Sequence, residues 1–570
     1  MKSVDSPPLL AYSPMIHARL FLETQNFRDR MFHPTRSGLA KPRHDIEDHT
    51  SPPYLDGHPG LDRPLFVQFC ANDPDVLLEA AQYVEPYCNA VDLNLGCPQG
   101  IARKGNYGAF LQEDQDLVYR LINKLHNHLD IPVTAKIRIL DTKEKTLQYA
   151  KKVLSAGASI ITIHGRQREQ KGHKTGLADW SVLKYLREQL PAETVIFANG
   201  NVLRHDDIQK CLEHTGADAV MSAEGNLYDP TIFATPPATG EEGREYWRGR
   251  NGKGGFRMDA VFRRYLDIIY KHVLERPPPV REPLYITSDP TSGLDSAVSP
   301  QASDQEPPKK KQKHGDGYER PNIPSLLVMQ PHLFHLLRPL VSKHTSIRDT
   351  LAKCRGGDVP AFEKVLQMVE AAVREGLLDY QANPSRYDDP EPLSEKARKE
   401  AKTSDESSVA TVAECKRPWW VCQPYVRPLP KEAVQKGSIT ISKKEKRRLE
   451  EEQTLQKVRT QDGTKSEREI LDARNGMPTK ELPGQAMVAG WRVVDCVNRS
   501  FEYRRPIALL STPALYISPT NMRTSCIPPH TLCGHSFVYI QCSINHLNRR
   551  HSEDDSEKVQ SNYLPLNAQI

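Results

Sequence analysis

Between residues 9 and about 235 the chain repeats one pattern of hydrophobic and polar positions. A short apolar run is followed by a turn and then by an amphipathic stretch with helical spacing, as in DPDVLLEAAQYVEPY and DQDLVYRLINKLHNHL. Strands that alternate with helices at roughly 30 residues per unit predict parallel βα units, in either an open doubly wound sheet or a barrel. The apolar runs are LLAYSPMI, PLFVQF, AVDLNLGCP, VTAKIRI, SIITIHGR, TVIFANGN and AVMSAEG.

Polar residues at the ends of these runs favour the barrel. Nearly every strand carries a Gln, Asn, Cys, Lys, His or Glu toward its C-terminal end, whereas a doubly wound sheet concentrates its ligands at one switch point. We therefore predict an α/β fold of the TIM (β/α)8 type, with seven of eight strands visible. Only eight residues precede the first run, which is too few for another βα unit. The first strand is therefore expected to be missing from an N-terminally incomplete barrel over residues 1–245.

The pattern changes after residue 245. The stretches FRMDAVFRRYLDIIYKHVL and AFEKVLQMVEAAVREGLL have helical spacing and predict a helical domain formed by residues 246–281 and 321–380. Residues 282–320 are rich in Pro and Ser and include PPKKKQKHGDG, which predicts a disordered basic insertion. We interpret residues 381–480 as a linker with a charged helix, and we assign no fold to residues 481–570.

Composition and charge narrow the function only slightly. The formal net charge of +5 is too small to identify a nucleic-acid binder. No window approaches 18 consecutive apolar residues, so we expect no membrane span and an intracellular location, in the cytoplasm, the nucleus or both. The basic run Lys309–Lys313 is either a weak nuclear signal or a solvated charge cluster. Cys526, Cys533 and Cys542 lie near histidines but lack paired CxxC spacing, so no metal is expected.

Candidate chemistry begins at Cys97, which follows a predicted buried strand and lies at the mouth of the barrel. An isolated cysteine is more often a small buried hydrophobe. Asn94, however, faces the same side of the strand and could orient a planar heterocycle beside the thiol. Lys136 lies inside an apolar strand, where a lysine needs a partner, and therefore predicts an anionic ligand. His164 ends the next strand and by itself would be interpreted as structural.

Two turns that contain glycine predict a phosphate site. ANGN (Ala198–Asn201) and SAEG (Ser222–Gly225) end the last two runs, which are strands seven and eight if a first strand is missing. Loops after those strands bind phosphate in many barrels through backbone N–H groups, although ordinary βα turns have a similar composition. Arg138 and Arg166 lie two residues beyond the lysine and the histidine, and they either contact a polyanion or form a solvated rim.

Residues 9 to about 235 resemble the tRNA-dihydrouridine synthases almost continuously. The similarity rests on DLNLGCPQG, VQFCANDPDVLLEAAQYVEPYCNAVD, KIRI, TIHGRQREQKGHKTGLADW, FANGN and VMSAEGNLYDP, and the run GCPQGIARKGNYGAFLQ is highly specific. The branch that acts on uridines 16 and 17 of the tRNA D-loop is the most similar. The resemblance implies an FMN-dependent barrel followed by a helical tRNA-binding domain. The family's first strand, with its APM turn, has no counterpart here.

The resemblance also implies a reaction and a set of residues. Uridine is reduced to 5,6-dihydrouridine: reduced FMN delivers hydride to C6 of uracil, Cys97 donates a proton to C5, and NADPH supplies the electrons. The helical domain of a monomeric enzyme would grip the tRNA backbone through Arg338, Lys343 and Arg348. The implied cofactor residues are Gln68, Lys136 and His164 for the flavin, and Asn199, Gly200, Asn201, Ala223 and Glu224 for the ribityl phosphate, Glu224 through its backbone N–H. Weaker candidates for substrate contact are Asn94, Arg138 and Arg166.

Two other functions remain open. A barrel that lacks a strand would present an unpaired edge, and the chain would then be a tRNA-binding protein without flavin or catalysis. A smaller alternative is a barrel flavoenzyme that acts on a free pyrimidine, similar to a dihydroorotate dehydrogenase. The helical domain and the basic segments argue against that alternative.

Overall fold

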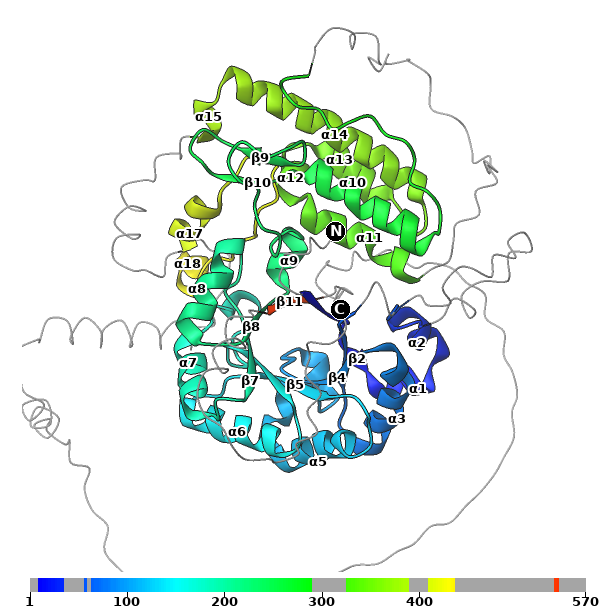
Figure 1. Cartoon of the computed structure of the whole chain (residues 1–570), viewed down its shortest axis with the longest axis vertical. Helices are drawn as coiled ribbons and strands as arrows, with labels where there is room; N and C mark the ends of the chain where they lie inside the picture. Colours follow the sequence, from blue (N-terminus) through cyan, green and yellow to red (C-terminus); the bar gives the residue numbers. More distant parts are fainter. Residues whose placement is uncertain are drawn as a thin grey trace, which may run out of the picture. The chain divides into compact units, whose positions relative to one another are not determined.

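A ring of strands forms the centre of the fold (Figure 1). The computed structural model describes residues 9–34, 56–58, 63–289, 324–388, 408–435 and 538–542. All seven predicted runs form strands, and β3 to β8 pair in parallel in chain order. The first run is interrupted between two short strands, β1 and β2, which both pair with β3. The strands are β1 (Leu9–Tyr12), β2 (Ile16–His17), β3 (Leu65–Cys70), β4 (Ala90–Leu95), β5 (Val133–Arg138), β6 (Ile160–His164), β7 (Val195–Asn199) and β8 (Ala219–Ser222).

Helices surround this ring (Figure 1). Several of them begin at a capping residue that the sequence supplies: Asp73, Asp114, Thr142 and Asp179, for example, each accept a hydrogen bond from a first-turn backbone N–H. The helices are α1 (Ala18–Glu23), α2 (Gln25–Met31), α3 (Pro74–Val84), α4 (Gly100–Lys104), α5 (Gln115–His126), α6 (Lys143–Ser155), α7 (Trp180–Gln189), α8 (His205–Thr215) and α9 (Glu224–Tyr228).

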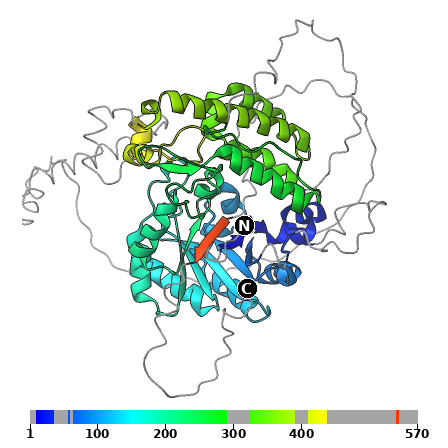
Figure 2. The ribbon, with the colours of Figure 1, turned by 45° about the horizontal axis from the view of Figure 1, so that its top comes forward.

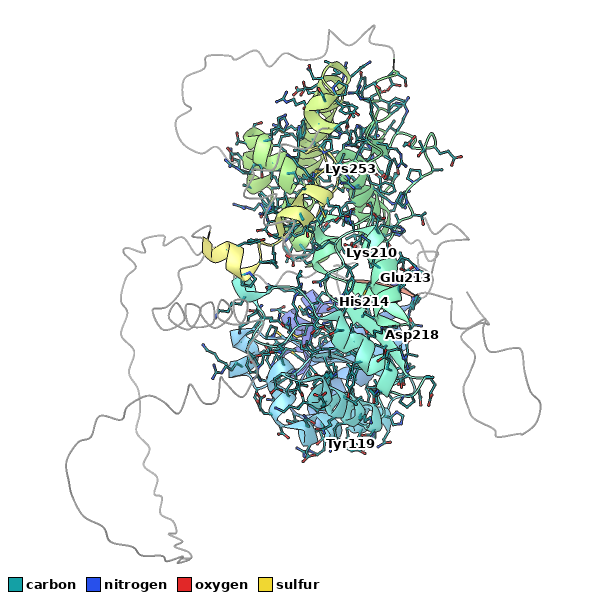
Figure 3. The ribbon with its side chains drawn as sticks, turned by 90° about the vertical axis from the view of Figure 1, so that its left-hand side faces the viewer. Tyr119, Lys210, Glu213, His214, Asp218 and Lys253 are labelled. Carbon is teal, nitrogen blue, oxygen red and sulfur yellow. The ribbon has the colours of Figure 1, made fainter. Side chains whose placement is uncertain are left out.

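Helix α8 illustrates how each helix covers the sheet. Ile208 and Cys211 are buried, whereas Lys210, Glu213 and His214 are exposed. Figure 3 shows these three polar residues on the outer side of the helix. The amphipathic spacing seen in the sequence therefore directs one face of α8 against the strands and the other toward solvent.

A strand from the tail of the chain occupies the eighth position of the ring. β11 (Val538–Cys542) lies between β1 and β8 and is antiparallel to both, with Ile540 opposite Leu10 on one side and Met221 on the other (Figure 2). Because β1 also pairs with β3, the strand order returns to its starting point. The parallel strands of the described residues come from seven runs, as predicted, because β1 and β2 share the first run, but the edge that was expected to be open is paired.

The interior of the ring is apolar at one end and polar at the other. Leu10, Phe66 and Ala90 belong to a small apolar cluster near the amino ends of the strands. Gln68 and Asp92 follow two residues later on β3 and β4 and therefore face the same interior. Every residue of these two strands is buried. The barrel thus directs its inward polar side chains toward the carboxyl ends of the strands.

A second apolar core lies in the helical region that follows the barrel. Phe362, Val365 and Val369 of the long helix α14 are fully buried together with Phe262 of α10. The spacing of three to four residues along α14 is the one that its sequence predicted. The elements are β9 (Tyr246–Arg248), β10 (Gly254–Phe256), α10 (Met258–Ile268), α11 (Met329–Leu336), α12 (Arg338–Lys343), α13 (Thr345–Lys353), α14 (Val359–Ala382) and α15 (Ser385–Asp388).

Residues 408–435 pack against this helical core, although the sequence assigned them to a linker with a charged helix. They contain α17 (Ser408–Cys415) and α18 (Pro430–Gln435). Between these helices, Trp420 is fully buried, and the N–H of Cys422 donates to the carbonyl of Phe256 at 2.9 Å. A run that appears polar overall can supply a core residue, because a single large aromatic side chain buries much area.

The start of the predicted insertion is also packed. Leu284 is buried, and the carboxylate of Asp289 pairs with the guanidinium of Arg244 at 2.7 Å. Residues 290–323, which include Lys309–Lys313, lie outside the described residues. The same holds for the tail expected over residues 481–570, except for β11.

Candidate active site

The loop after β4 carries Cys97 at the carboxyl end of the barrel. Its side chain is partly exposed, as the predicted position at the mouth requires. The Oδ1 atom of Asn94 accepts hydrogen bonds from the N–H of Gly96 at 3.1 Å and from the N–H of Cys97 at 2.9 Å. Asn94 is therefore beside Cys97, as predicted, but its carboxamide oxygen is engaged with the loop.

Three contacts hold the carbonyl groups of the same loop. The N–H of Ala109 donates to the carbonyl of Cys97 at 3.1 Å. The Nε atom of Arg138 donates to the carbonyl of Gly96 at 2.7 Å, and the Nζ atom of Lys171 donates to the carbonyl of Pro98 at 2.6 Å. Arg138 is buried and therefore belongs to the frame of the loop rather than to a solvated rim.

A buried carboxylate that the sequence reasoning missed lies below this loop. Asp92 accepts hydrogen bonds from Gln68 Nε2 at 2.7 Å and from Thr134 Oγ1 at 2.6 Å. Tyr12 donates a longer bond of 3.4 Å to the same carboxylate. Burial raises the pKa of Asp92 to about 6, although these donors and the charge of Lys136 oppose the increase.

Lys136 lies opposite Asn94 in the register of β5 and β4. Burial lowers the pKa of its ammonium group to about 8, and the positive charge of Arg138 adds to this effect. Asp92 acts in the other direction. The ammonium group is therefore a cation that the protein solvates poorly, which fits the predicted role of binding an anion.

His164, Arg166 and Asn201 form the next part of the site. The guanidinium of Arg166 lies 3.0 Å from His164 Nε2 through NH1, and it donates to Asn201 Oδ1 at 2.9 Å through NH2. Burial, followed by the charges of Lys136, Arg138 and Arg166, lowers the pKa of His164 well below its usual value. The imidazole is therefore neutral, and its Nε2 accepts a hydrogen bond from the guanidinium N–H of Arg166.

The turn after β7 requires a glycine. Gly200 has a φ of +113°, and a Cβ atom there would lie 2.6 Å from Ala178 Cβ and 3.2 Å from His164 Cδ2. Asn201 also has a positive φ, of 62°, and its carboxamide bonds both the N–H and the carbonyl of Ala178 at 2.9 Å. The close approach shows that a side chain at position 200 would clash with Ala178, so this turn requires glycine.

The turn after β8 is tied to a segment that is distant in sequence. Asn199 donates to the carbonyl of Met221 at 2.9 Å and so joins the ends of β7 and β8. Ala223 precedes α9, and the carboxylate of Glu224 pairs with Arg427 at 2.6 Å. The Glu224 carboxylate is thus engaged by Arg427, and a phosphate contact through its backbone N–H stays a prediction.

The three basic residues assigned to tRNA lie in the helical region, and Arg338 also reaches the barrel, because its guanidinium donates to the hydroxyl of Tyr228 on α9 at 3.5 Å. The guanidinium of Arg338 lies 3.6 Å from the ring centroid of Tyr425. The ammonium group of Lys343 lies 4.6 Å from the ring centroid of Trp419. Arg348 is exposed beside Asp349. Two of the three therefore rest on aromatic rings of the segment 408–435, whose contribution the sequence did not indicate.

A barrel with a thiol, amides, a lysine and a histidine gathered at the carboxyl ends of its strands has the architecture of a (β/α)8-type enzyme. The family described as Dihydrouridine synthase (Dus) matches residues 6–249. The chain belongs to the dihydrouridine synthase family and is an oxidoreductase, as the resemblance predicted.

Curated relatives share most of the chain. The tRNA-dihydrouridine(16/17) synthase of Saccharomyces cerevisiae is 42% identical over 423 residues, which cover 74% of this chain and 78% of the relative. The Schizosaccharomyces pombe protein of the same name is 40% identical, with 74% and 82% covered. A Rattus norvegicus protein named tRNA-dihydrouridine(16/17) synthase-like is 33% identical over 445 residues, which cover 78% of this chain and 74% of the relative.

No helix in the described part of the chain is long and apolar enough to span a bilayer. No group of three or more His, Cys, Asp or Glu residues there is placed to hold a metal ion. Of the tail cysteines considered as zinc ligands, only Cys542 falls within the described residues, as the last residue of β11.

Proposed function

We propose that this chain reduces uridine to 5,6-dihydrouridine in the D-loop of tRNA, at positions 16 and 17, with FMN as cofactor and NADPH as electron donor. The observation that carries the proposal is the position of Cys97 at the carboxyl end of β4, with Asn94 and Lys136 beside it on paired strands. The names of the relatives support the reaction and the tRNA positions.

The charges of the site fit an anionic cofactor. Burial lowers the pKa values of Arg138 and Arg166 to about 10, and Arg166 contributes to the shift of Arg138. Arg138 in turn contributes to the shift of Lys136. Three cations that repel one another favour the binding of an anion between or beside them. The phosphate and the reduced flavin of FMN both carry negative charge.

We assign the residues to the cofactor by their place at the strand ends. Gln68, Lys136 and His164 would contact the flavin, with Lys136 neutralising charge on the reduced ring. The turns after β7 and β8 would hold the phosphate end. Those turns contribute Asn199, Gly200, Asn201, Ala223 and the backbone of Glu224. Bound FMN would supply the hydride for C6 of uracil.

Cys97 would donate the proton to C5 of uracil from its Sγ atom. A protonated thiol suits this step, because a general acid must carry a proton at the working pH. Asn94 holds the loop by accepting from the Cys97 N–H. The uracil must leave the tRNA stack to reach the thiol, because the reacting carbon atoms are inaccessible within a folded RNA.

The helical region would bind the tRNA backbone. Arg338 and Lys343 rest on aromatic rings, and Arg348 is exposed on α13. Phosphate contacts by such cations supply affinity without sequence preference. We further propose that Arg138 and Arg166 act on the substrate only indirectly, because their guanidinium groups already bond the site's own loops.

The alternative function, a tRNA-binding protein without catalysis, depended on an open barrel. β11 pairs with both strands that would have formed the open edge. Flavin content separates the two functions. The alternative predicts a colourless protein that still binds tRNA, and that result would overturn the enzyme proposal.

The decisive experiment combines flavin absorbance of the purified chain with dihydrouridine analysis in a strain that lacks its own enzyme for positions 16 and 17. We expect a yellow protein that restores dihydrouridine. The Cys97→Ala variant should retain flavin and lose at least about 100-fold of the activity, which is the usual contribution of a positioned proton donor. Cys211→Ala is the matched control, because Cys211 is buried on α8. It should retain activity.

A further inference from the structure

The proposed reaction leaves one charged group of the barrel interior without a role. Asp92 is fully buried on β4, and its two carboxylate oxygens accept from three side chains on three other strands. Burying a carboxylate costs free energy unless hydrogen bonds compensate for the lost water. A residue with this cost inside a core is therefore expected to perform a task that an apolar residue cannot.

A directed chain of hydrogen bonds leads from this carboxylate to the loop of Cys97. Gln68 Nε2 donates to Asp92 at 2.7 Å, and Asn94 Nδ2 donates to Gln68 Oε1 at 2.8 Å. Asn94 Oδ1 then accepts from the Cys97 N–H at 2.9 Å. Gln68 and Asn94 are buried along the way.

The chemistry of its two ends determines the direction of this chain. A carboxylate can only accept, so it selects the Nε2 end of Gln68 and leaves Oε1 for Asn94. Asn94 must then turn Nδ2 toward Gln68 and Oδ1 toward the loop. The backbone N–H groups of Gly96 and Cys97 are donors and require that same orientation. The two amides consequently have one arrangement in which every bond is made.

We propose that Asp92 is a positioning residue whose buried carboxylate sets the orientation of the Gln68 and Asn94 amides and, through them, the N–H side of the loop that presents Cys97. The inference rests on the proposed role of Cys97 as proton donor. Asp92 would touch neither uracil nor flavin and would act only through the side-chain amides of Gln68 and Asn94, which lie at the site.

The other anchors of the loop make the effect local. Arg138, Lys171 and Ala109 bond the carbonyl groups of Gly96, Pro98 and Cys97, respectively. Loss of the hydrogen bonds that run from Asp92 through Gln68 and Asn94 removes only the support at the N–H groups of the Cys97 loop. The loop should therefore loosen at Cys97 without unfolding the barrel.

The test compares Asp92→Leu and Asp92→Asn with a matched control, Thr134→Val. Leucine has the same branching at Cγ as aspartate, is somewhat larger and cannot accept a hydrogen bond. Asparagine preserves the shape but can donate as well as accept, so it no longer selects one end of Gln68. Thr134→Val removes a 2.6 Å bond to the same carboxylate but leaves the chain to Cys97 intact.

The first readout is the rate at which iodoacetamide labels Cys97, followed by peptide mass spectrometry without tRNA or NADPH. We expect labelling to change by about fivefold in both Asp92 variants and by less than about twofold in Thr134→Val, because only the Asp92 variants remove the acceptor that orients Gln68 and Asn94. Cys88 and Cys211 are buried and serve as internal standards for unfolding. They should remain unlabelled in all three variants.

The second readout is steady-state kinetics. In Asp92→Asn we expect kcat per bound flavin to fall by about tenfold while kcat/KM for NADPH stays unchanged, because a misplaced acid affects only the protonation of uracil. Unchanged Cys97 labelling and kcat in a folded Asp92→Asn protein would overturn the inference. If Asp92→Leu fails to fold, the Asn variant decides. An inactive wild-type chain would defeat the proposed function, yet the labelling comparison would still test Asp92.

Discussion

Two opposite charges, Lys136 and Asp92, face the barrel interior from adjacent strands. Burial lowers the pKa of the lysine to about 8 and raises the pKa of the aspartate to about 6, and each charge partly offsets the shift of the other. Both groups therefore remain charged at neutral pH, but at a cost in folding free energy. The buried charges of Lys136 and Asp92 lower the stability of the fold and in return fix where charge lies in the site.

The pH dependence of stability should reveal the cost at Asp92. Its folded-state pKa of about 6 lies above the ordinary value of 3.8. The folded state therefore binds the extra proton between those values, and stability falls as the pH rises through that window. The side chain of Asp92→Asn is neutral at every pH. The free energy of unfolding of this variant should therefore equal that of the wild type near pH 4 and exceed it by up to about 3 kcal/mol at pH 7. Denaturant unfolding of both proteins at the two pH values measures this difference.

A gain in stability combined with a loss of activity would distinguish a positioning role from simple damage. Damage to a core lowers stability and activity together. An Asp92→Asn protein that is less stable than the wild type at pH 7 would contradict this account of the buried carboxylate.

Residue type alone singled out part of the site. Lys136 is a candidate because a lysine inside an apolar strand needs a partner, and Cys97 is a candidate because it ends a strand. Asp92 has the same signal as Lys136, a charged residue within the apolar run AVDLNL. Its partners come from β1, β3 and β5. Such partners are separated by tens of residues, so no local pattern identifies them.

At the scale of elements, the turn after β7 depends on close approach. A Cβ atom at Gly200 would meet Ala178 Cβ at 2.6 Å, whereas one at Gly240, which also has a positive φ, would meet nothing within 4 Å. Both glycines therefore have a backbone conformation that disfavours a side chain, but only Gly200 also lacks the space for one.

We predict that Gly200→Ala lowers the flavin content of the purified protein by more than about fivefold, because the turn must move away from His164 and Ala178. Gly240→Ala carries the conformational cost of about 1 kcal/mol without the clash, and it should keep its flavin. Absorbance of bound flavin per mole of protein provides the comparison. Equal flavin content in the two variants would show that the close approach is unimportant.

The segment 408–435 is an element that the sequence assigned to a linker. The rings of Trp247, Tyr387 and Trp419 lie within 6.0 Å of the buried ring of Trp420. Removal of such a side chain leaves a large cavity in the helical core.

Trp420→Ala should therefore lower the free energy of unfolding by about 3 to 5 kcal/mol. Val412→Ala on α17 is the control, because Val412 is 46% exposed. It should change the free energy by less than about 0.5 kcal/mol. Urea unfolding monitored by circular dichroism gives the free energy of unfolding of both variants. Tryptophan fluorescence is a second probe for Val412→Ala, which keeps all its tryptophans. A small effect at Trp420 would mean that the segment does not stabilise the helical region.

At the scale of the whole molecule, closure of the ring depends on a strand more than 300 residues beyond β8 in the sequence. β11 pairs with β8 through residues 539–542 and with β1 through residues 538–541. A strand with neighbours on both sides uses its N–H groups in the ladder, and proline cannot supply one.

Ile540→Pro should consequently open the ring, lower the flavin content and promote aggregation through the exposed edges of β1 and β8. Asn545→Pro, beyond the end of β11, is the matched control and should behave like the wild type. Size-exclusion chromatography and flavin absorbance report the two effects. A monomeric, flavin-loaded Ile540→Pro protein would show that closure by β11 is dispensable.

The sequence by itself determined the seven βα runs, the family and the residue types at the strand ends, because periodicity and motifs are local properties of a chain. Only the tertiary structure decided how the ring closes, which bonds Asp92 makes, and that Trp420 returns to the helical core. These features depend on hydrogen bonds and packing between residues far apart in the chain. Their partners become neighbours only when the strands assemble, so no single stretch of sequence contains both sides of the contact.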